Sequence, residues 1–122
     1  MTWDIEQLHQ RLQDALEKVA PCQMGTFRTG AKRQIVYDLQ NIVLDVWESG
    51  RPRIARASYQ IQIYQQDFDP TLPMRALTKL TAIGASAMAD GEAYTDTSGY
   101  TVAGITATLW KEINYNAESL DY

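Results

Sequence analysis

The chain has 122 residues, of which 45% are hydrophobic and 21% are charged, and its net charge is −4. This length suits one hydrophobic core, and the acidic balance argues against a protein that binds duplex nucleic acid over its whole surface, since Lys and Arg supply most phosphate contacts. No apolar run approaches the roughly 20 residues of a membrane span, and the N-terminus lacks the basic and apolar regions of a signal peptide, so we expect no membrane partner.

The first predicted element is an amphipathic helix over residues 3–19. Its apolar residues recur at steps of three and four and form one stripe, which consists of Ile5, Leu8, Leu12, Ala15, Leu16 and Val19. Thr2 is placed to cap this helix, and Pro21 ends it. Segment 22–32 has two glycines and no periodicity, so we expect a loop there that is mobile from Gly25 to Arg33.

Two short β-branched runs follow this loop, at residues 35–39 and 42–47. The two residues between them are polar, and the sequence leaves open whether 34–47 forms one kinked strand or a tight hairpin. A loop by composition, residues 49–53, leads into the next strand.

The strongest strand signal lies at residues 57–63. Apolar side chains occupy the odd positions and polar side chains the even ones, which is the period of a half-buried strand. We expect Ile61 and Ile63 to lie under the second helix, and Gln60 and Gln62 to face solvent or a neighbouring molecule.

A second helix is predicted to begin at Asp69-Pro70 or at Thr71, because proline is tolerated in the first turn of a helix. We expect it to end at Asp90-Gly91. Its predicted buried stripe consists of Met74, Leu77, Leu80, Ile83 or Gly84, Ala87 and Met88, and Arg75 and Lys79 face outward. A short strand over 93–96 and a long strand over 102–113 complete the chain.

The order of these elements predicts an α+β fold. We expect a mixed, mostly antiparallel sheet of four to five strands, with two helices packed on one face. The chain forms one domain over residues 1–122 in this prediction, with frayed ends at 1–2 and 116–122.

Five acidic residues near predicted turns raise the question of a cation site, because hard cations bind several carboxylate oxygens: Asp67, Asp69, Asp90, Glu92 and Asp96. Structural roles explain these residues better. Aspartates before Pro70 cap a helix, and Asp90 and Asp96 flank turns. We therefore predict no metal site.

The remaining candidates for chemistry are weak. A single cysteine, Cys22, and a single histidine, His9, leave no internal disulfide and no Cys/His set for zinc. His9 lies off the helical stripe and is expected in solvent, and Cys22 has no base beside it in the sequence. Segment 25–32 differs from a phosphate-binding loop because it precedes a strand instead of following one. We predict no catalytic residue and no cofactor.

Charge is unevenly distributed along the chain. Segment 28–56 holds six basic residues against three acidic ones, whereas segment 67–96 holds two basic residues against five acidic ones. Opposite charges on two segments suit head-to-tail contacts between copies, which close into a ring when the rotation allows, although ordinary mixing of surface charge would give the same counts. The predicted contact residues are Arg28, Lys32, Arg33, Arg51, Arg53, Asp90 and Glu92.

The order, lengths and composition of these elements resemble those of the tail completion, or tail terminator, proteins of long-tailed bacteriophages. The resemblance covers residues 3–115. It is carried by the helix 3–19, the run 35–39, the strand 58–64, the helix begun by Asp69-Pro70, the dipeptide Gly99-Tyr100 and the strand 102–110. No motif carries it, so it transfers no functional residue to this chain.

The resemblance implies a structural virion protein without catalysis, located in the phage tail and assembled in the host cytoplasm. It implies a homo-oligomeric ring, expected to be a hexamer, that caps the tail tube, ends its polymerisation and forms the head–tail joining surface. Its partners would be further copies of this chain, the tail tube protein and a head completion or connector protein, with DNA only passing through the ring lumen. The alternative is a small α+β ligand-binding domain or enzyme with an acidic site near Asp90.

Overall fold

The computed structural model describes residues 5–25, 30–48 and 50–112. Its elements in chain order are α1 (Ile5–Glu17), β1 (Cys22–Met24), β2 (Arg33–Glu48), β3 (Arg51–Gln65), α2 (Thr71–Ala82), β4 (Ser86–Ala89), β5 (Tyr94–Thr95) and β6 (Thr101–Glu112). The predicted frayed ends lie outside the described residues, as does Arg28. None of the described helices is long and apolar enough to cross a membrane.

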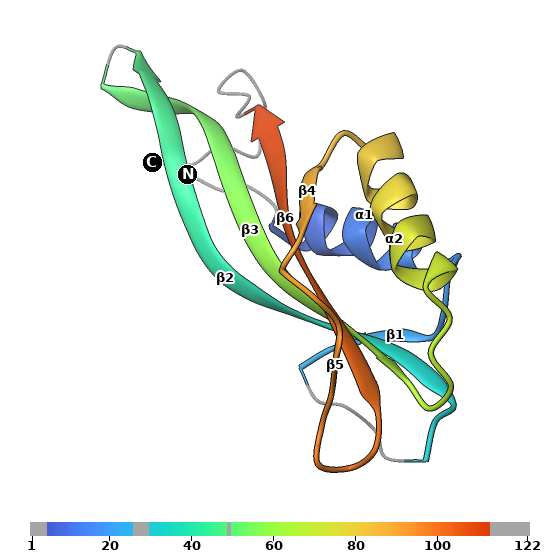
Figure 1. Cartoon of the computed structure of the whole chain (residues 1–122). Coiled ribbons are helices and arrows are strands. Elements are labelled where there is room, and N and C mark those ends of the chain that lie inside the picture. Colours follow the sequence, from blue (N-terminus) through green and yellow to red (C-terminus); the bar gives the residue numbers. More distant parts are fainter. Residues whose placement is uncertain (1–4, 26–29, 49, 113–122) are drawn as a thin grey trace.

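The strands form one open sheet in the order β1-β2-β3-β6-β4, with β5 beside β6. The pair β1–β2 is parallel and the other pairs are antiparallel. Both helices lie on the same side of this sheet (Figure 1). The predicted α+β class is confirmed. The sheet has six strands instead of four or five because β1 lies in the predicted loop and β4 lies in the predicted second helix.

Segment 34–47 belongs to one strand, β2, with a bulge in its middle. Leu39 pairs with Tyr59 and Asn41 pairs with Ser58, so Gln40 is an extra residue without a partner across the ladder. An extra residue reverses the alternation of side chains between the two faces. The core-facing positions are therefore odd before the bulge and even after it, which places Ile42 on the helix side.

Strand β3 buries its odd positions, as predicted. Its fully buried side chains on the helix side are Ala55, Ala57, Tyr59, Ile61 and Ile63. The even positions 54–64 are half-buried on the opposite face. A strand with paired neighbours on both sides is shielded along its edges, which explains why even its polar face is only partly accessible.

The core lies between β2, β3 and β6 on one side and the two helices on the other. Helix α1 contributes Leu8, Leu12 and Leu16, which are fully buried and come from the predicted stripe. Helix α2 contributes Leu72, Ala76 and Leu80, whereas the predicted core residue Met74 is 66% exposed. The predicted stripe of α2 is therefore wrong at Met74, because the helix is rotated so that Leu72 and Ala76 face the sheet.

The second helix ends eight residues before the predicted position. Gly84 adopts a φ of +85°, which favours glycine, and its N–H donates to the Thr81 carbonyl over 3.0 Å. The Ala85 N–H donates to the Leu80 carbonyl over 3.0 Å. These two bonds form a Schellman end, which turns the chain out of the helix. Ala87 and Met88 therefore belong to the edge strand β4 and not to the helix.

Candidate functional site

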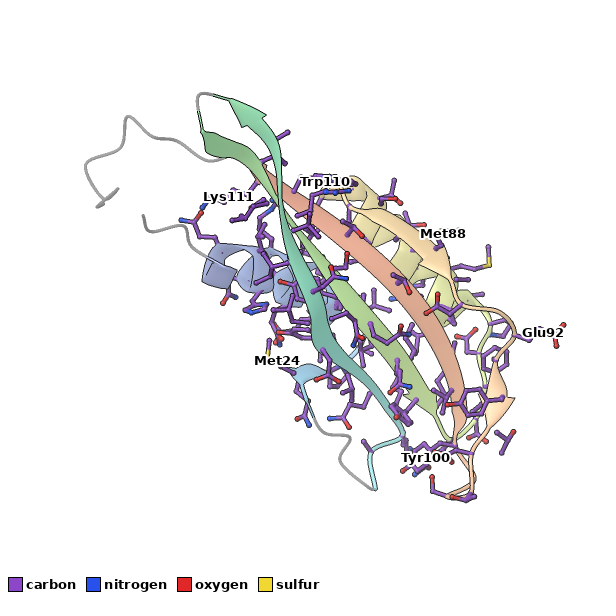
Figure 2. All side chains as sticks on the ribbon, turned by 90° about the vertical axis from the view of Figure 1, so that its left-hand side faces the viewer. Met24, Met88, Glu92, Tyr100, Trp110 and Lys111 are labelled. Atoms are coloured by element: carbon purple, nitrogen blue, oxygen red, sulfur yellow. The ribbon has the colours of Figure 1, made fainter. Side chains whose placement is uncertain are left out.

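The face of the sheet opposite the helices is open and largely polar (Figure 2). Its centre is made by β3 and β6, which pair from Ile54–Glu112 to Gln65–Thr101. Its half-buried side chains are mostly uncharged and include Ser58, Gln60, Gln62, Thr106 and Thr108. The hydroxyl oxygens of Ser58 and Thr108 lie 3.1 Å apart in one cross-strand pair. An uncovered sheet face of this kind offers a broad contact area to another macromolecule.

Asp90, a predicted contact residue and the centre of the alternative acidic site, lies on this open face. Gln60 Nε2 donates to Asp90 Oδ2 over 2.7 Å, and the Thr106 hydroxyl lies 2.9 Å from each carboxylate oxygen. The Asp90 N–H donates to the Gly104 carbonyl over 2.8 Å, and a Cβ at position 104 would lie 3.3 Å from the Cβ of Asp90. The carboxylate is thus held against the sheet by neutral side chains.

Three large apolar side chains are exposed near the two edges of the open face. Val43 is 39% exposed, Trp110 40% and Met88 69%. Val43 and Trp110 flank Arg56 in one row, because Arg56 pairs with Val43 on β2 and with Trp110 on β6. Met88 lies on β4 beside Thr106. Apolar side chains exposed together on one surface are typical of an interaction site.

Both edges of the sheet are bare over part of their length. Within the described residues, β1 pairs with β2 only from Ile35 to Tyr37, so no strand lies beside β2 from Asp38 to Glu48. Strand β4 forms the opposite edge, and no described strand lies on its outer side. Unpaired N–H and C=O groups along an edge are a template for pairing with another chain. These two free edges and the open face are the candidate functional site.

The predicted charged contact residues are spread over the molecule. Lys32 and Arg33 are exposed at the start of β2. Arg51 and Arg53 lie at the start of β3, at the other end of the same hairpin. The side chains of Arg51 and Arg53 are not among those described. Glu92 is exposed at the opposite edge and points away from the sheet (Figure 2). The structure therefore separates the basic residues but places Glu92 across the sheet from Lys32 and Arg33.

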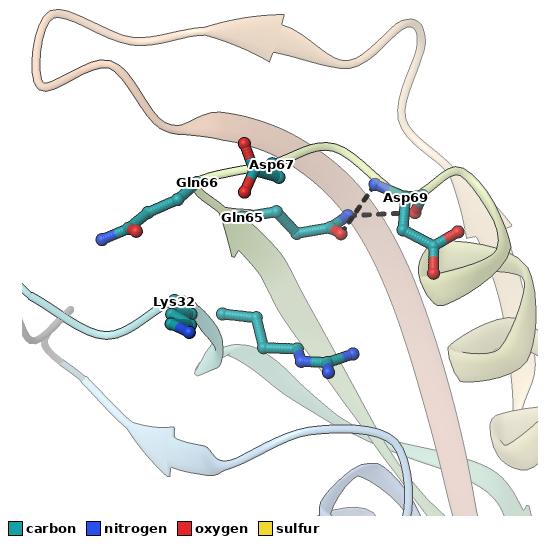
Figure 3. Close-up of a pocket in the computed structure, with 6 residues that line it drawn as sticks. Lys32, Gln65, Gln66, Asp67 and Asp69 are labelled. Atoms are coloured by element: carbon teal, nitrogen blue, oxygen red, sulfur yellow. Dashed lines mark hydrogen bonds between the residues drawn. The ribbon is translucent and has the colours of Figure 1, made fainter.

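A cavity of about 250 Å³ lies between the start of β2 and the end of β3 (Figure 3), and its lining residues are Lys32, Arg33, Gln65, Gln66, Asp67 and Asp69. The Gln65 side chain pins the turn through two bonds with the main chain of Asp69, at 3.2 and 2.9 Å. The Asp69 carboxylate accepts from the hydroxyl and the N–H of Thr71, and these bonds hold its pKa below the ordinary value. Asp69 therefore caps α2, as predicted. Among the described residues, no three His, Cys, Asp or Glu side chains gather to hold a metal ion.

Tyr100 binds the main chain of one part of the loop that was predicted to be mobile. Its hydroxyl donates to the Ala31 carbonyl over 2.9 Å and accepts from the Gly30 N–H over 3.1 Å and from Gln66 Nε2 over 3.0 Å. Tyr100 is only 6% exposed, so these bonds are shielded from water. The loop is thus anchored at Gly30 and Ala31, while residues 26–29 lie outside the described residues.

A chain of hydrogen bonds links α1 to the sheet, and sequence reasoning missed it. His9 Nδ1 lies 2.7 Å from the Tyr59 hydroxyl. The Tyr37 hydroxyl donates to Gln13 Oε1 over 2.6 Å, and Gln13 Nε2 donates to the Cys22 carbonyl over 2.7 Å. The expectation of a solvated His9 is wrong, because its ring is half-buried against Tyr59. The four-residue spacing of His9 and Gln13, which puts both on one helix face, was the available signal.

Three side chains in this region have a raised pKa and keep their protons well above neutral pH. Burial, reinforced by the nearby Glu17, raises the pKa of Cys22 from 9.0 to about 12. Burial also raises the pKa of Tyr37 and of Tyr59 from 10.0 to about 12, with smaller contributions from Cys22 and Glu17 at Tyr37 and from Tyr37 at Tyr59. Cys22 is therefore a poor candidate nucleophile, because the thiolate is the reactive form.

These pKa values predict a loss of stability in alkali. Between about pH 9 and pH 12 the unfolded chain releases protons that the folded chain still holds, so the free energy of unfolding falls as the pH rises. Urea unfolding followed at a series of pH values measures this slope. Replacing Cys22 by Ser and Tyr37 by Phe should flatten it. A stability that is constant or rises over this range would contradict the assignment.

Comparisons with known proteins find likenesses among solved structures alone. No family model matches the sequence, and no curated protein matches it either. Among solved structures, the chain is similar to the gp17 protein of bacteriophage SPP1, with 14% sequence identity and a TM-score of 0.47, over 94% of this chain and 96% of that one. A TM-score of this size carries no inference about function, which therefore rests on the residues themselves.

Proposed function

We propose that this chain is a structural phage virion protein that assembles into a ring, caps the tail tube and forms the surface to which the head joins. The observation that carries the proposal is the open sheet with two free edges, 38–48 on β2 and 86–89 on β4. Two different edges on opposite sides of one sheet suit a head-to-tail contact, and such contacts generate closed rings or open filaments. The resemblance of the sequence to tail completion proteins favours the closed ring.

A structural role also agrees with the chemistry of the described residues. Asp90 is bound by Gln60 and Thr106, and Asp69 is bound by Thr71, so both carboxylates have structural partners. The largely polar open face and its exposed apolar side chains supply contact area. We propose the tail tube protein and a head completion or connector protein as the partners of the two ring faces, and the phage tail as the location.

The proposal is tested by assembly. Light scattering after size exclusion measures the mass of the assembled species, and negative-stain electron microscopy shows whether that species is closed. Added to polymerising tail tube protein from the same phage, a ring of this chain should end the growth of the tubes. A chain that stays monomeric at high concentration and on tube ends, or that leaves tube length unchanged, would overturn the proposal.

Charge reversal tests the head-to-tail arrangement. Changing Lys32 and Arg33 together to Glu should weaken assembly several-fold at low salt, because exposed pairs are each worth roughly 0.2–1 kcal/mol and are screened by salt.

The matched control is the pair Arg75→Glu and Lys79→Glu, which makes the same change of charge on the exposed side of α2. If both charge-reversed pairs weaken assembly equally, the effect is one of net charge. A specific contribution of Lys32 and Arg33 to the head-to-tail contact would then be wrong.

A further inference from the structure

We propose that neighbouring copies join by strand addition, with β4 of one copy pairing to the free edge of β2 in the next. The residues that pair are Ile42–Leu44 of β2 and Ala87–Ala89 of β4. This inference rests on the proposed ring, and it identifies the main-chain groups through which neighbouring copies bind each other. It is carried by the direction of the main-chain groups, by the agreement of the two faces and by the symmetry of the contact.

The main-chain groups of β2 point outward at known positions. The Ile35 N–H donates to the Pro21 carbonyl and the Gly25 N–H donates to the Tyr37 carbonyl, at 2.8 and 3.0 Å, so the main chain of core-facing residues points to the free edge. After the bulge the core-facing residues are Ile42 and Leu44, which pair across the ladder with Ala57 and Ala55. Their N–H and C=O groups therefore line the bare part of the edge.

The same reasoning shows which main-chain N–H and C=O groups of β4 point away from β6. The Asp90 N–H donates to the Gly104 carbonyl, and Met88 pairs with Thr106, so the even residues of β4 bond to β6. Ala87 and Ala89 then present their N–H and C=O groups to the outer side. Both are core-facing, because they pair with Ala107 and Ile105, which are buried.

The two edges fit each other when one copy is shifted sideways, and by four residues along the strands, without being turned over. Within one chain, β4 runs antiparallel to β2, since three antiparallel pairings separate them. Antiparallel pairing then sets Ile42 against Ala89 and Leu44 against Ala87 on the helix side. Val43 meets Met88 on the open face, where both side chains are exposed in the single chain. The helices of both copies then lie on one side of the joined sheet, and both open faces lie on the other.

Symmetry favours this partner over a second β2 strand. The segment Ser86–Ala89 has no charged residue, and neither has Asn41–Leu44. Antiparallel pairing of β2 with itself would be isologous and would stop at a dimer, whereas pairing of β2 with β4 is heterologous and can close a ring. The uncharged part of the β2 edge remains open to a partner strand.

Proline substitution tests the pairing through the main chain. Ile42→Pro removes an outward N–H and leaves the ladder to β3 intact, and Ala89→Pro does the same on β4. Each should raise the concentration at which half of the chains are assembled by about tenfold or more, because an interface carbonyl loses its donor. Ile42→Ala and Ala89→Ser keep the N–H and should assemble within about threefold of the unchanged protein. Circular dichroism and urea unfolding check that all four variants fold.

A disulfide trap tests the register. In a Cys22→Ser background, Val43→Cys with Met88→Cys should cross-link successive copies under mild oxidation into multimers larger than dimers. Residues opposite each other without ladder bonds lie about 4.5 Å apart at Cα, within the range of about 4.4–6.8 Å that a disulfide spans. Val43→Cys with Tyr94→Cys, on the same edge but out of register, is the control and should cross-link at least about tenfold less.

The outcomes separate this inference from the proposed function. Rings that form equally well with both proline variants, or that show no preference for the 43–88 pair over the 43–94 pair, overturn strand addition and leave the ring standing. Cross-linked chains that grow into open filaments on tube ends support strand addition and overturn the closed cap. A protein that neither assembles nor cross-links overturns both.

Discussion

Ile61→Ala should lower the free energy of unfolding by about 2 to 5 kcal/mol, as the truncation of a fully buried aliphatic side chain does. Ile61 is fully buried in the centre of β3, between β2 and β6, and belongs to the same core cluster as Leu72, Ala76 and Leu80 of α2. Neighbours on both sides limit the collapse of the cavity that the substitution leaves. Urea unfolding of the isolated protein measures the change.

Gln60→Ala is the matched control for Ile61→Ala, one residue away on the other face. Its side chain is half-buried and bonds to Asp90 Oδ2, so we expect a loss of about 1 kcal/mol or less. The two substitutions should therefore differ clearly in their urea midpoints. Equal losses would mean that the alternation of β3 between a core face and an open face is wrong.

The sequence was informative where one physical signal dominated. Residues 57–63 alternate with a period of two, and the structure buries every odd position among them. Asp69 stands two residues before Thr71, and it caps the helix there. In both cases the local pattern and the tertiary environment favour the same structure, so a single sequence is enough to predict the element.

The predictions failed where tertiary contacts decide the structure. Strand β4 consists of Ser86–Ala89, whose alanines favour a helix, and what ends the helix is the conformation of Gly84. Strand β1 has three residues and exists because β2 offers it an edge at Ile35–Tyr37. Both strands are too short for a hydrophobic period to be detected in the sequence.

Only part of the candidate site could be predicted, because tertiary contacts decide the rest. The sequence indicated uneven charge, and the structure places Glu92 across the sheet from Lys32 and Arg33. The free edge of β2 could not be foreseen, because it depends on where β1 stops pairing and on the bulge at Gln40. Edges are properties of the assembled sheet, and the residues that line them carry no special composition.

Tyr59→Ala should be among the most destabilising single substitutions in this protein, with a loss of about 3 to 5 kcal/mol, comparable to the truncation of other buried aromatic rings. The ring is fully buried, lies edge-on to Tyr37 with 6.2 Å between centroids, and holds His9 at its hydroxyl end. Urea unfolding near neutral pH measures the loss. Tyr59→Phe keeps the ring and removes only the hydroxyl, so we expect a loss of about 0.5–1.5 kcal/mol from that change.

A double-mutant cycle separates the hydrogen bond of Tyr59 from its packing. Tyr59→Phe and His9→Ala are made singly and together, and the difference between the double change and the sum of the single ones measures the coupling of the two side chains. Because Tyr59 is fully buried and His9 half-buried, we expect a coupling of about 0.5–1.5 kcal/mol, carried by the 2.7 Å contact between the hydroxyl and Nδ1. Strictly additive losses would mean that His9 contributes only its packing against the ring, and that this bond does not tie α1 to the sheet.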